Sequence, residues 1–169
     1  MYFEDQLKNF IMIWRLLPSN FSIVVKEHPT CIGDNSLKFY KEILKFNQTF
    51  IIDDNENFEN LIKNSYATFS VASTASIQSS LLNIPSFTLV PCFFNELKYS
   101  ENITISQLRE LKTLNDLVKE MFKKNKIKKR TQNTIFFKNS FNGYLIGDKK
   151  FHKQNIKNIA NAFFETFND

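Results

Sequence analysis

The chain has 169 residues, of which 43% are hydrophobic and 15% aromatic, and its net charge is +5. This length fits one domain with a substantial core, and the apolar content excludes a disordered protein. The charge excess is local, because residues 123–130 hold six cations and no acid. A uniformly basic nucleic-acid binder is therefore not expected. The basic segment is either a solvated helix end with a linker, or a contact to anionic lipid or another polyanion.

Cysteine usage and hydropathy narrow the class further. Cys31 and Cys92 lack the spacing of a metal site, so we expect buried free thiols in a reducing cytosol, with no metal and no cofactor. No apolar run reaches the roughly 18 residues that a membrane-spanning helix needs. The acidic start and Arg15 argue against a signal peptide. We expect a cytoplasmic protein, with the basic segment as a candidate contact to the inner membrane surface.

Apolar periodicity predicts helices alternating with strands up to about residue 90. The predicted helices cover residues 2–17, 37–44, 58–62 and 74–82, and the predicted strands cover residues 21–26, 49–52, 67–71 and 86–90. Candidate helix caps are Asp34, Asn35 and the acidic pair at 53 and 54. In the helix over 74–82, Ile77, Leu81 and Leu82 are expected on one side. Apolar strands alternating with helices predict an α/β fold, a three-layer Rossmann-like domain whose mostly parallel sheet is covered on both faces.

The pattern is looser after Pro91. Residues 106–123 are expected to be helical in one or two pieces, and residues 134–137 to form a short strand or an extended arm. The last helix carries one apolar stripe, made of Ile156, Ile159, Ala160, Phe163, Phe164 and Phe167. We expect a single domain over residues 1–169, with its core in residues 20–110 and a helical C-terminal extension over residues 111–169.

Polar side chains follow two of the predicted strands. Lys26, His28 and Pro29 close the first strand, and Ser73 and Thr74 follow the third. Ligands of open parallel sheets bind at the carboxyl ends of the strands. Imidazole can donate a hydrogen bond to a phosphate oxygen, proline stiffens its loop, and the free N–H groups of a helix start favour an anion. The alternatives are a surface histidine in a turn and ordinary N-capping by a hydroxyl.

Other polar and aromatic residues near these strand ends leave their roles open. Glu27 either pairs with a neighbouring strand, orients the histidine beside it or is solvated. Asp53 and its neighbour are expected to cap a helix rather than to catalyse a reaction. The aromatic pair at 93 and 94 and Tyr99 either line a base or sugar pocket or pack in the core.

Several segments resemble one protein family. Residues 23–29 read Ile-Val-Val-Lys-Glu-His-Pro and precede a loop with Gly33. They resemble the "vvKEHP…G" segment of bacterial capsule polysaccharide biosynthesis proteins. These proteins are similar to transferases of the sugar acid Kdo. Residues 70–79 and 83–85 fall where that family carries "T-G-T-x-G-x-E-A…kP", and residues 90–94 match its "fG…fY" region less closely. A His-Pro step with a Ser/Thr motif also resembles GT-B sialyltransferases, which use CMP-activated sugar acids. The resemblance covers about residues 20–110.

The resemblance implies a fold and a function. The chain would correspond to the C-terminal, donor-binding half of a GT-B glycosyltransferase of capsule or surface polysaccharide biosynthesis, with a CMP-linked sugar acid such as Kdo as donor. The implied binding residues are Lys26, His28, Pro29, Ser73, Thr74, Ser76 and Gln78, with His28, Ser73 and Thr74 at the nucleotide phosphate. This chain has Ser73 and Ser76 where the family has glycine, and Gln78 where the family has a glutamate that binds the ribose.

The resemblance also implies partners. They are the nucleotide-sugar donor, a glycan acceptor and an N-terminal partner domain or subunit, because the family's acidic catalytic residues have no counterpart in this chain. The chain is then a fragment of a longer protein, one of two polypeptides or a form that has lost catalysis. Two alternatives are a non-catalytic interaction module with a degenerate GT-B-like fold and a peripheral membrane or polyanion binder. No nucleic-acid partner is expected.

Overall fold

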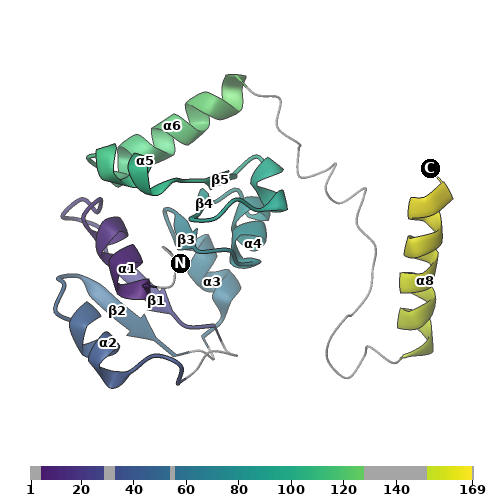
Figure 1. Cartoon of the computed structure of the whole chain (residues 1–169), viewed down its shortest axis with the longest axis horizontal. Coiled ribbons are helices and arrows are strands. Elements are labelled where there is room, and N and C mark those ends of the chain that lie inside the picture. Colours follow the sequence, from purple (N-terminus) through teal and green to yellow (C-terminus); the bar gives the residue numbers. More distant parts are fainter. Residues whose placement is uncertain (1–4, 29–32, 54–55, 128–151, 169) are drawn as a thin grey trace. The chain divides into compact units, whose positions relative to one another are not determined.

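The computed structural model describes residues 5–28, 33–53, 56–127 and 152–168, which belong to two compact units, Met1–Arg130 and Thr131–Asp169. The first unit contains, in chain order, α1 (Gln6–Trp14), β1 (Ile23–Lys26), α2 (Leu37–Ile43), β2 (Thr49–Ile52), α3 (Phe58–Lys63), β3 (Thr68–Ser70), α4 (Ala75–Leu81), β4 (Ser86–Thr88), the 3-10 helix η2 (Phe93–Glu96), β5 (Ser100–Asn102), α5 (Ile105–Glu110) and α6 (Leu114–Ile127) (Figure 1). The second unit contains α8 (Lys153–Asn168), which confirms the predicted last helix.

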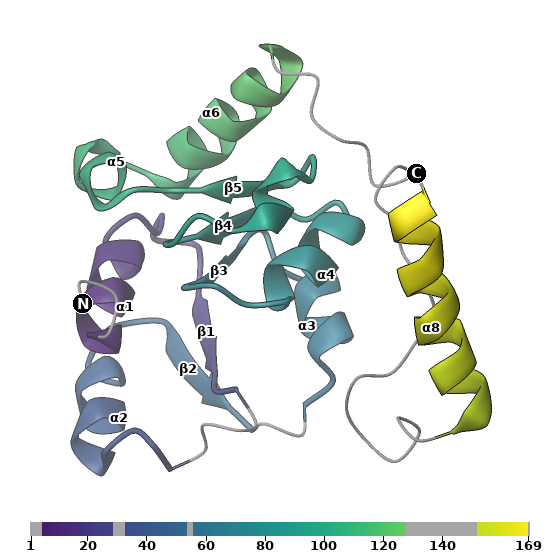
Figure 2. The same cartoon turned by 45° about the vertical axis from the view of Figure 1, so that its right-hand side comes forward.

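The strands of the first unit pair in parallel in two small sheets. One sheet has the order β1-β2 and the other the order β3-β4-β5. β1 lies between β2 and β3 in both views (Figures 1 and 2). The rings of Phe21 and Tyr66, each two residues before its strand, meet edge to face with centroids 5.0 Å apart. β1 and β3 therefore begin beside each other, although they belong to separate sheets.

Helices lie on both sides of these strands. Figure 2 shows α1 and α2 on one side, α3 and α4 on the other, and α5 and α6 beyond β5. The predicted α/β class with parallel strands is therefore confirmed, and so is the alternation of elements up to β4. The coverage of the sheets is less complete than expected within the first unit. Val24 and Phe50, which are register partners in β1 and β2, remain 49% and 55% exposed.

The predicted helix caps are wrong by a few positions. Ser36 caps α2, and its hydroxyl accepts a hydrogen bond from the backbone N–H three residues on, so neither Asp34 nor Asn35 has this role. Asn57 caps α3 in the same way, instead of the acidic pair at 53 and 54. Both caps have extended backbone angles directly before the first turn, where a short polar side chain can reach the free N–H groups.

One face of the β3-β4-β5 sheet is apolar and forms the main core. Phe69 and Phe87 are register partners whose rings stack with centroids 5.2 Å apart. The buried residues packed together here come from β4, α5, α6 and the segments that follow α1, β4 and β5: Leu16, Phe87, Leu89, Ile103, Leu108, Leu114, Leu117, Val118 and Met121. The core thus reaches beyond residues 20–110, because the end of the α1 segment and α6 both contribute to it.

The other face of this sheet carries hydroxyl groups, because serine and threonine alternate with phenylalanine along β3 and β4. This face is covered by α4 through three serines that are at most 1% exposed: Ser76, Ser79 and Ser80. The Ser86 hydroxyl donates to Ser76 Oγ over 2.6 Å, and the Thr68 hydroxyl donates to Ser79 Oγ over 2.9 Å. Ile77, Leu81 and Leu82, which were expected on one side of this helix, are only partly buried, and the serines form its most buried side.

The segment after Pro91 is more ordered than its sequence pattern indicates. It forms η2 and the strand β5, neither of which was predicted, and then two helices, α5 and α6, which begin one residue before the predicted helical range of 106–123 and end four residues after it. The predicted strand or arm at 134–137 lies outside the described residues. A bilayer span would need a longer and more apolar helix than any in the described part of the chain.

Candidate functional site

The carboxyl end of β1 carries two of the predicted site residues. Lys26 is the last residue of the strand, and its ammonium donates a hydrogen bond to the backbone oxygen of Asp53, 3.2 Å away at the end of β2. His28 follows two residues later and is exposed. Pro29 lies outside the described residues. A cationic side chain is therefore held across the ends of both parallel strands, with an exposed imidazole beside it.

Glu27, between these two residues, is directed towards α2. Its carboxylate accepts a hydrogen bond from the Asn35 side chain and is also hydrogen-bonded to the Tyr40 hydroxyl. The hydrogen bond to Glu27, and then burial, raise the pKa of Tyr40 above its ordinary value, because a phenolate would repel the carboxylate. Glu27 therefore fastens the end of β1 to the start of α2.

The turn from β3 into α4 carries the second group of predicted site residues. The Ser73 hydroxyl accepts a hydrogen bond from the Ala75 N–H, over 3.2 Å, and so satisfies one backbone donor at the helix start. Thr74 occupies the N-cap position and is exposed, and its hydroxyl makes no capping bond. Gln78 is exposed one turn later. The Thr74 hydroxyl and the Gln78 amide thus face solvent on the first turns of α4.

Ser76 differs from the other candidates because its side chain points into the protein. The residue is 1% exposed, and its hydroxyl accepts from Ser86 and lies 3.3 Å from the Ser70 hydroxyl. This hydroxyl belongs to the contact between α4 and the sheet. The structure therefore brings Lys26 and His28 together at one strand end and Ser73, Thr74 and Gln78 at another, and it separates Ser76 from both groups.

The aromatic candidates divide between surface and core. Phe93 is 75% exposed, whereas Phe94 is buried and meets it edge to face. Tyr99 is half-buried, and its ring contacts that of Phe122 on α6. Cys92 is a half-buried free thiol whose pKa is raised by burial, and Cys31 lies outside the described residues.

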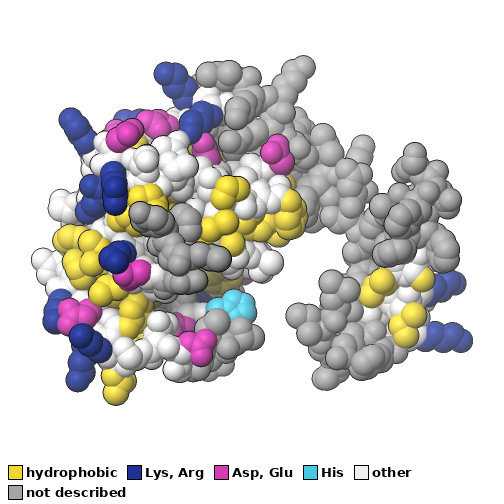
Figure 3. All heavy atoms as spheres, in the orientation of Figure 1, with side chains coloured by type: hydrophobic (Ala, Val, Ile, Leu, Met, Phe, Trp, Pro, Cys, Tyr) yellow, Lys and Arg dark blue, Asp and Glu magenta, His cyan; other side chains and the backbone are white. Residues whose placement is uncertain are grey.

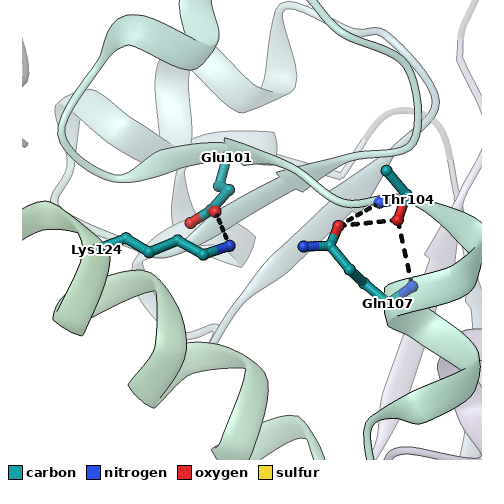
Figure 4. Close-up of polar contacts among 4 residues, drawn as sticks. All are labelled: Glu101, Thr104, Gln107 and Lys124. Atoms are coloured by element: carbon teal, nitrogen blue, oxygen red, sulfur yellow. Dashed lines mark hydrogen bonds and ion pairs between the residues drawn. The ribbon is translucent and has the colours of Figure 1, made fainter.

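A second polar cluster, between β5 and α6, was not predicted. Glu101 is 7% exposed, and its carboxylate forms an ion pair of 2.6 Å with Lys124 (Figure 4). Beside it, Thr104 and Gln107 form a capping box at the start of α5, with bonds of 2.8 and 3.2 Å. The Thr-x-x-Gln spacing of the capping box is visible in the sequence. The ion pair has no local signal, because its partners are 23 positions apart.

Metal-binding groups do not gather in the part of the chain that the structure describes, where no set of three His, Cys, Asp or Glu side chains is placed to hold an ion. Comparison with protein-family models, with curated proteins and with solved structures gives no match to this chain. The geometry of the two strand ends is therefore the basis for a functional assignment.

Proposed function

We propose that the first unit binds a nucleotide-sugar donor, a CMP-linked sugar acid, as the donor-binding half of a glycosyltransferase that builds capsule or surface polysaccharide. One observation carries the proposal: side chains able to bind a phosphate follow two strands, β1 and β3, that begin beside each other. The resemblance of the same segments to capsule polysaccharide biosynthesis proteins supports it.

The strand order supports a site at this edge. β1-β2 and β3-β4-β5 are separate sheets, but β1 lies between β2 and β3 (Figures 1 and 2), so the strands lie in the order 2-1-3-4-5, which reverses between β1 and β3. In open α/β sheets, ligands bind outside the carboxyl ends of the strands where the order reverses. That position lies between β1 and β3, so the donor phosphate would meet Lys26 and His28 from one side and Thr74 from the other.

The chemistry of these groups suits the departure of CMP. When the bond between the sugar and the phosphate oxygen breaks, the phosphate gains a second negative charge. The Lys26 ammonium and the His28 imidazole would stabilise this charge with charge-assisted hydrogen bonds, and the Thr74 hydroxyl would add a neutral donor. Gln78, one helical turn away, would hydrogen-bond the nucleotide where the similar family has a carboxylate. The N-terminal partner domain or subunit would bind the glycan acceptor and would supply the catalytic acid or base.

Calorimetry with CMP tests the proposal. The chain should bind CMP, and His28→Ala should weaken binding at least several-fold, because the imidazole makes a charge-assisted bond to the phosphate. His152→Ala is the matched control, since His152 is also exposed but lies just before α8, and it should leave the affinity unchanged. Equal affinity of the wild type and His28→Ala for CMP would refute the site. Failure to bind any of the three nucleotides CMP, UMP and AMP would refute the function.

A further inference from the structure

The outward side of α6 presents an aromatic side chain among lysines. We call this surface, made of Lys98, Tyr99, Lys119, Phe122 and Lys123, the α6 patch. Phe122 is 40% exposed, and its ring meets Tyr99 edge to face with centroids 5.9 Å apart. The Lys98 ammonium lies over the Tyr99 ring, 5.2 Å from its centroid. Lys119 and Lys123 are exposed and one helical turn apart, and Phe122 lies on the same side of the helix beside them.

Two acidic residues of α6 stand close to these lysines, because Asp116 is three positions before Lys119 and Glu120 is three positions before Lys123. Lys124 turns towards the sheet, where it neutralises the buried carboxylate of Glu101. Glu120 lines the same shallow pocket as these two residues. Asp116 is engaged by Thr113 at the helix start, where the Thr113 hydroxyl donates to its carboxylate over 2.8 Å. The three lysines of the α6 patch therefore outnumber the two carboxylates beside them, one of which already accepts a hydrogen bond from Thr113.

The second unit, described by itself, carries an independent feature of the same kind. α8 has 16 residues, and apolar residues recur in its sequence at the spacing of one helix face. Ile156, on that face, is 54% exposed. Lys153 and Lys157 are exposed, and their helical positions border the apolar face. An apolar helix face with lysine at its border is typical of helices that lie in the headgroup region of a bilayer.

We propose that this protein binds the surface of anionic membranes, with the α6 patch as the electrostatic contact and α8 as an amphipathic interfacial helix. Lysines near anionic headgroups attract the surface, and an exposed aromatic ring between them enters the interface. A nucleic acid fits less well. Figure 3 shows a face on which cationic and acidic side chains are mixed over both α5–α6 and α2, with hydrophobic side chains between them, so no broad basic face is present there. An apolar helix face would also have no role on a nucleic acid.

Sedimentation of the full chain with vesicles tests this proposal. Vesicles of phosphatidylcholine with added phosphatidylglycerol should retain the chain, vesicles of phosphatidylcholine alone should not, and high salt should release it. The Lys119→Gln/Lys123→Gln variant should bind about 25-fold more weakly, because each lysine near an anionic surface contributes about fivefold. Phe122→Ser should also weaken binding without changing the charge. Lys124 is left intact in these variants, since its loss would leave Glu101 buried without this partner.

The matched control is Lys38→Gln/Lys41→Gln, which removes the same charge from exposed positions on α2. An Ile156→Ser/Ile159→Ser variant tests α8 separately and should weaken binding with the α6 patch unchanged. The proposal would be overturned by equal binding to both kinds of vesicle or by no binding to either. It would also be overturned if the α6 and α2 variants lost vesicle affinity equally. Release from the vesicles by a single-stranded oligonucleotide at equal phosphate concentration would also overturn it in favour of a general polyanion site. CMP affinity should be unchanged in every variant, so this test is separate from that of the donor site.

Discussion

The inward position of Ser76 makes a quantitative prediction about stability. Ser86 donates its hydroxyl proton to Ser76 Oγ over 2.6 Å, and both residues are at most 1% exposed. Substitution of Ser76 by alanine removes the acceptor and leaves the Ser86 hydroxyl buried away from water. A buried polar group that loses its partner costs about 1–3 kcal/mol. At about 2–4 °C per kcal/mol for a chain of this size, Ser76→Ala should lower Tm by about 4–8 °C for a loss of about 2 kcal/mol.

A double-mutant cycle separates this cost from other effects of the substitution. Ser76→Ala/Ser86→Ala removes both hydroxyls, so the double variant should be less destabilised than the sum of the two single variants. Urea unfolding followed by circular dichroism measures each free energy of unfolding. Ser73→Ala is the control, because this hydroxyl is only partly buried, and it should cost about 1 kcal/mol or less. A Ser76→Ala variant with unchanged stability and weaker CMP binding would show that the hydroxyl serves a ligand.

Two further predictions concern interactions that the sequence did not reveal. Lys124→Ala should destabilise the fold by about 1–3 kcal/mol in urea unfolding, because it leaves the buried Glu101 without this partner; the partial exposure of Lys124 limits the loss. Lys123→Ala is the control and should cost much less. Equal losses of stability in the two variants would contradict the importance of the ion pair. The Tyr40 phenol should titrate at higher pH than an unperturbed tyrosine in NMR, and Glu27→Gln should lower its pKa, since the bond to Glu27 is the main cause of the increase. The raised pKa favours the neutral phenol in the fold, so the contribution of Tyr40 to stability should be present below the unfolded pKa of about 10 and decline as pH rises above it.

The strands were predictable to different extents. β1 and β2 are runs of β-branched and aromatic residues bounded by polar ones, and the sequence places them within two residues of their observed bounds. β3 and β4 have a serine or threonine on either side of one phenylalanine, which is the alternation of a strand. The hydrogen bonds of their polar face were not predicted, because the partners of these hydroxyls, Ser76 and Ser79, belong to a different element.

β5 lacks a local signal altogether. Its three residues, Ser-Glu-Asn, are polar and have low strand propensity. The strand forms because β4 offers it a parallel ladder and because distant side chains satisfy its polar groups. The Asn95 amide donates to both Thr88 and Ser100, over 3.0 and 3.1 Å, and Lys124 neutralises Glu101. These contacts connect residues that only the folded chain brings together.

The candidate site was predictable in position and only partly in composition. His28 and Thr74 follow strand ends that apolar runs predict, so their placement depends on local pattern alone. The role of Ser76 depends on the contact between α4 and the sheet. Here serine is small enough to keep α4 close to β4, and its hydroxyl bonds to Ser86 in that strand. Serine at this position therefore belongs to the packing of helix on sheet, whereas Thr74 and His28 are exposed at the two strand ends.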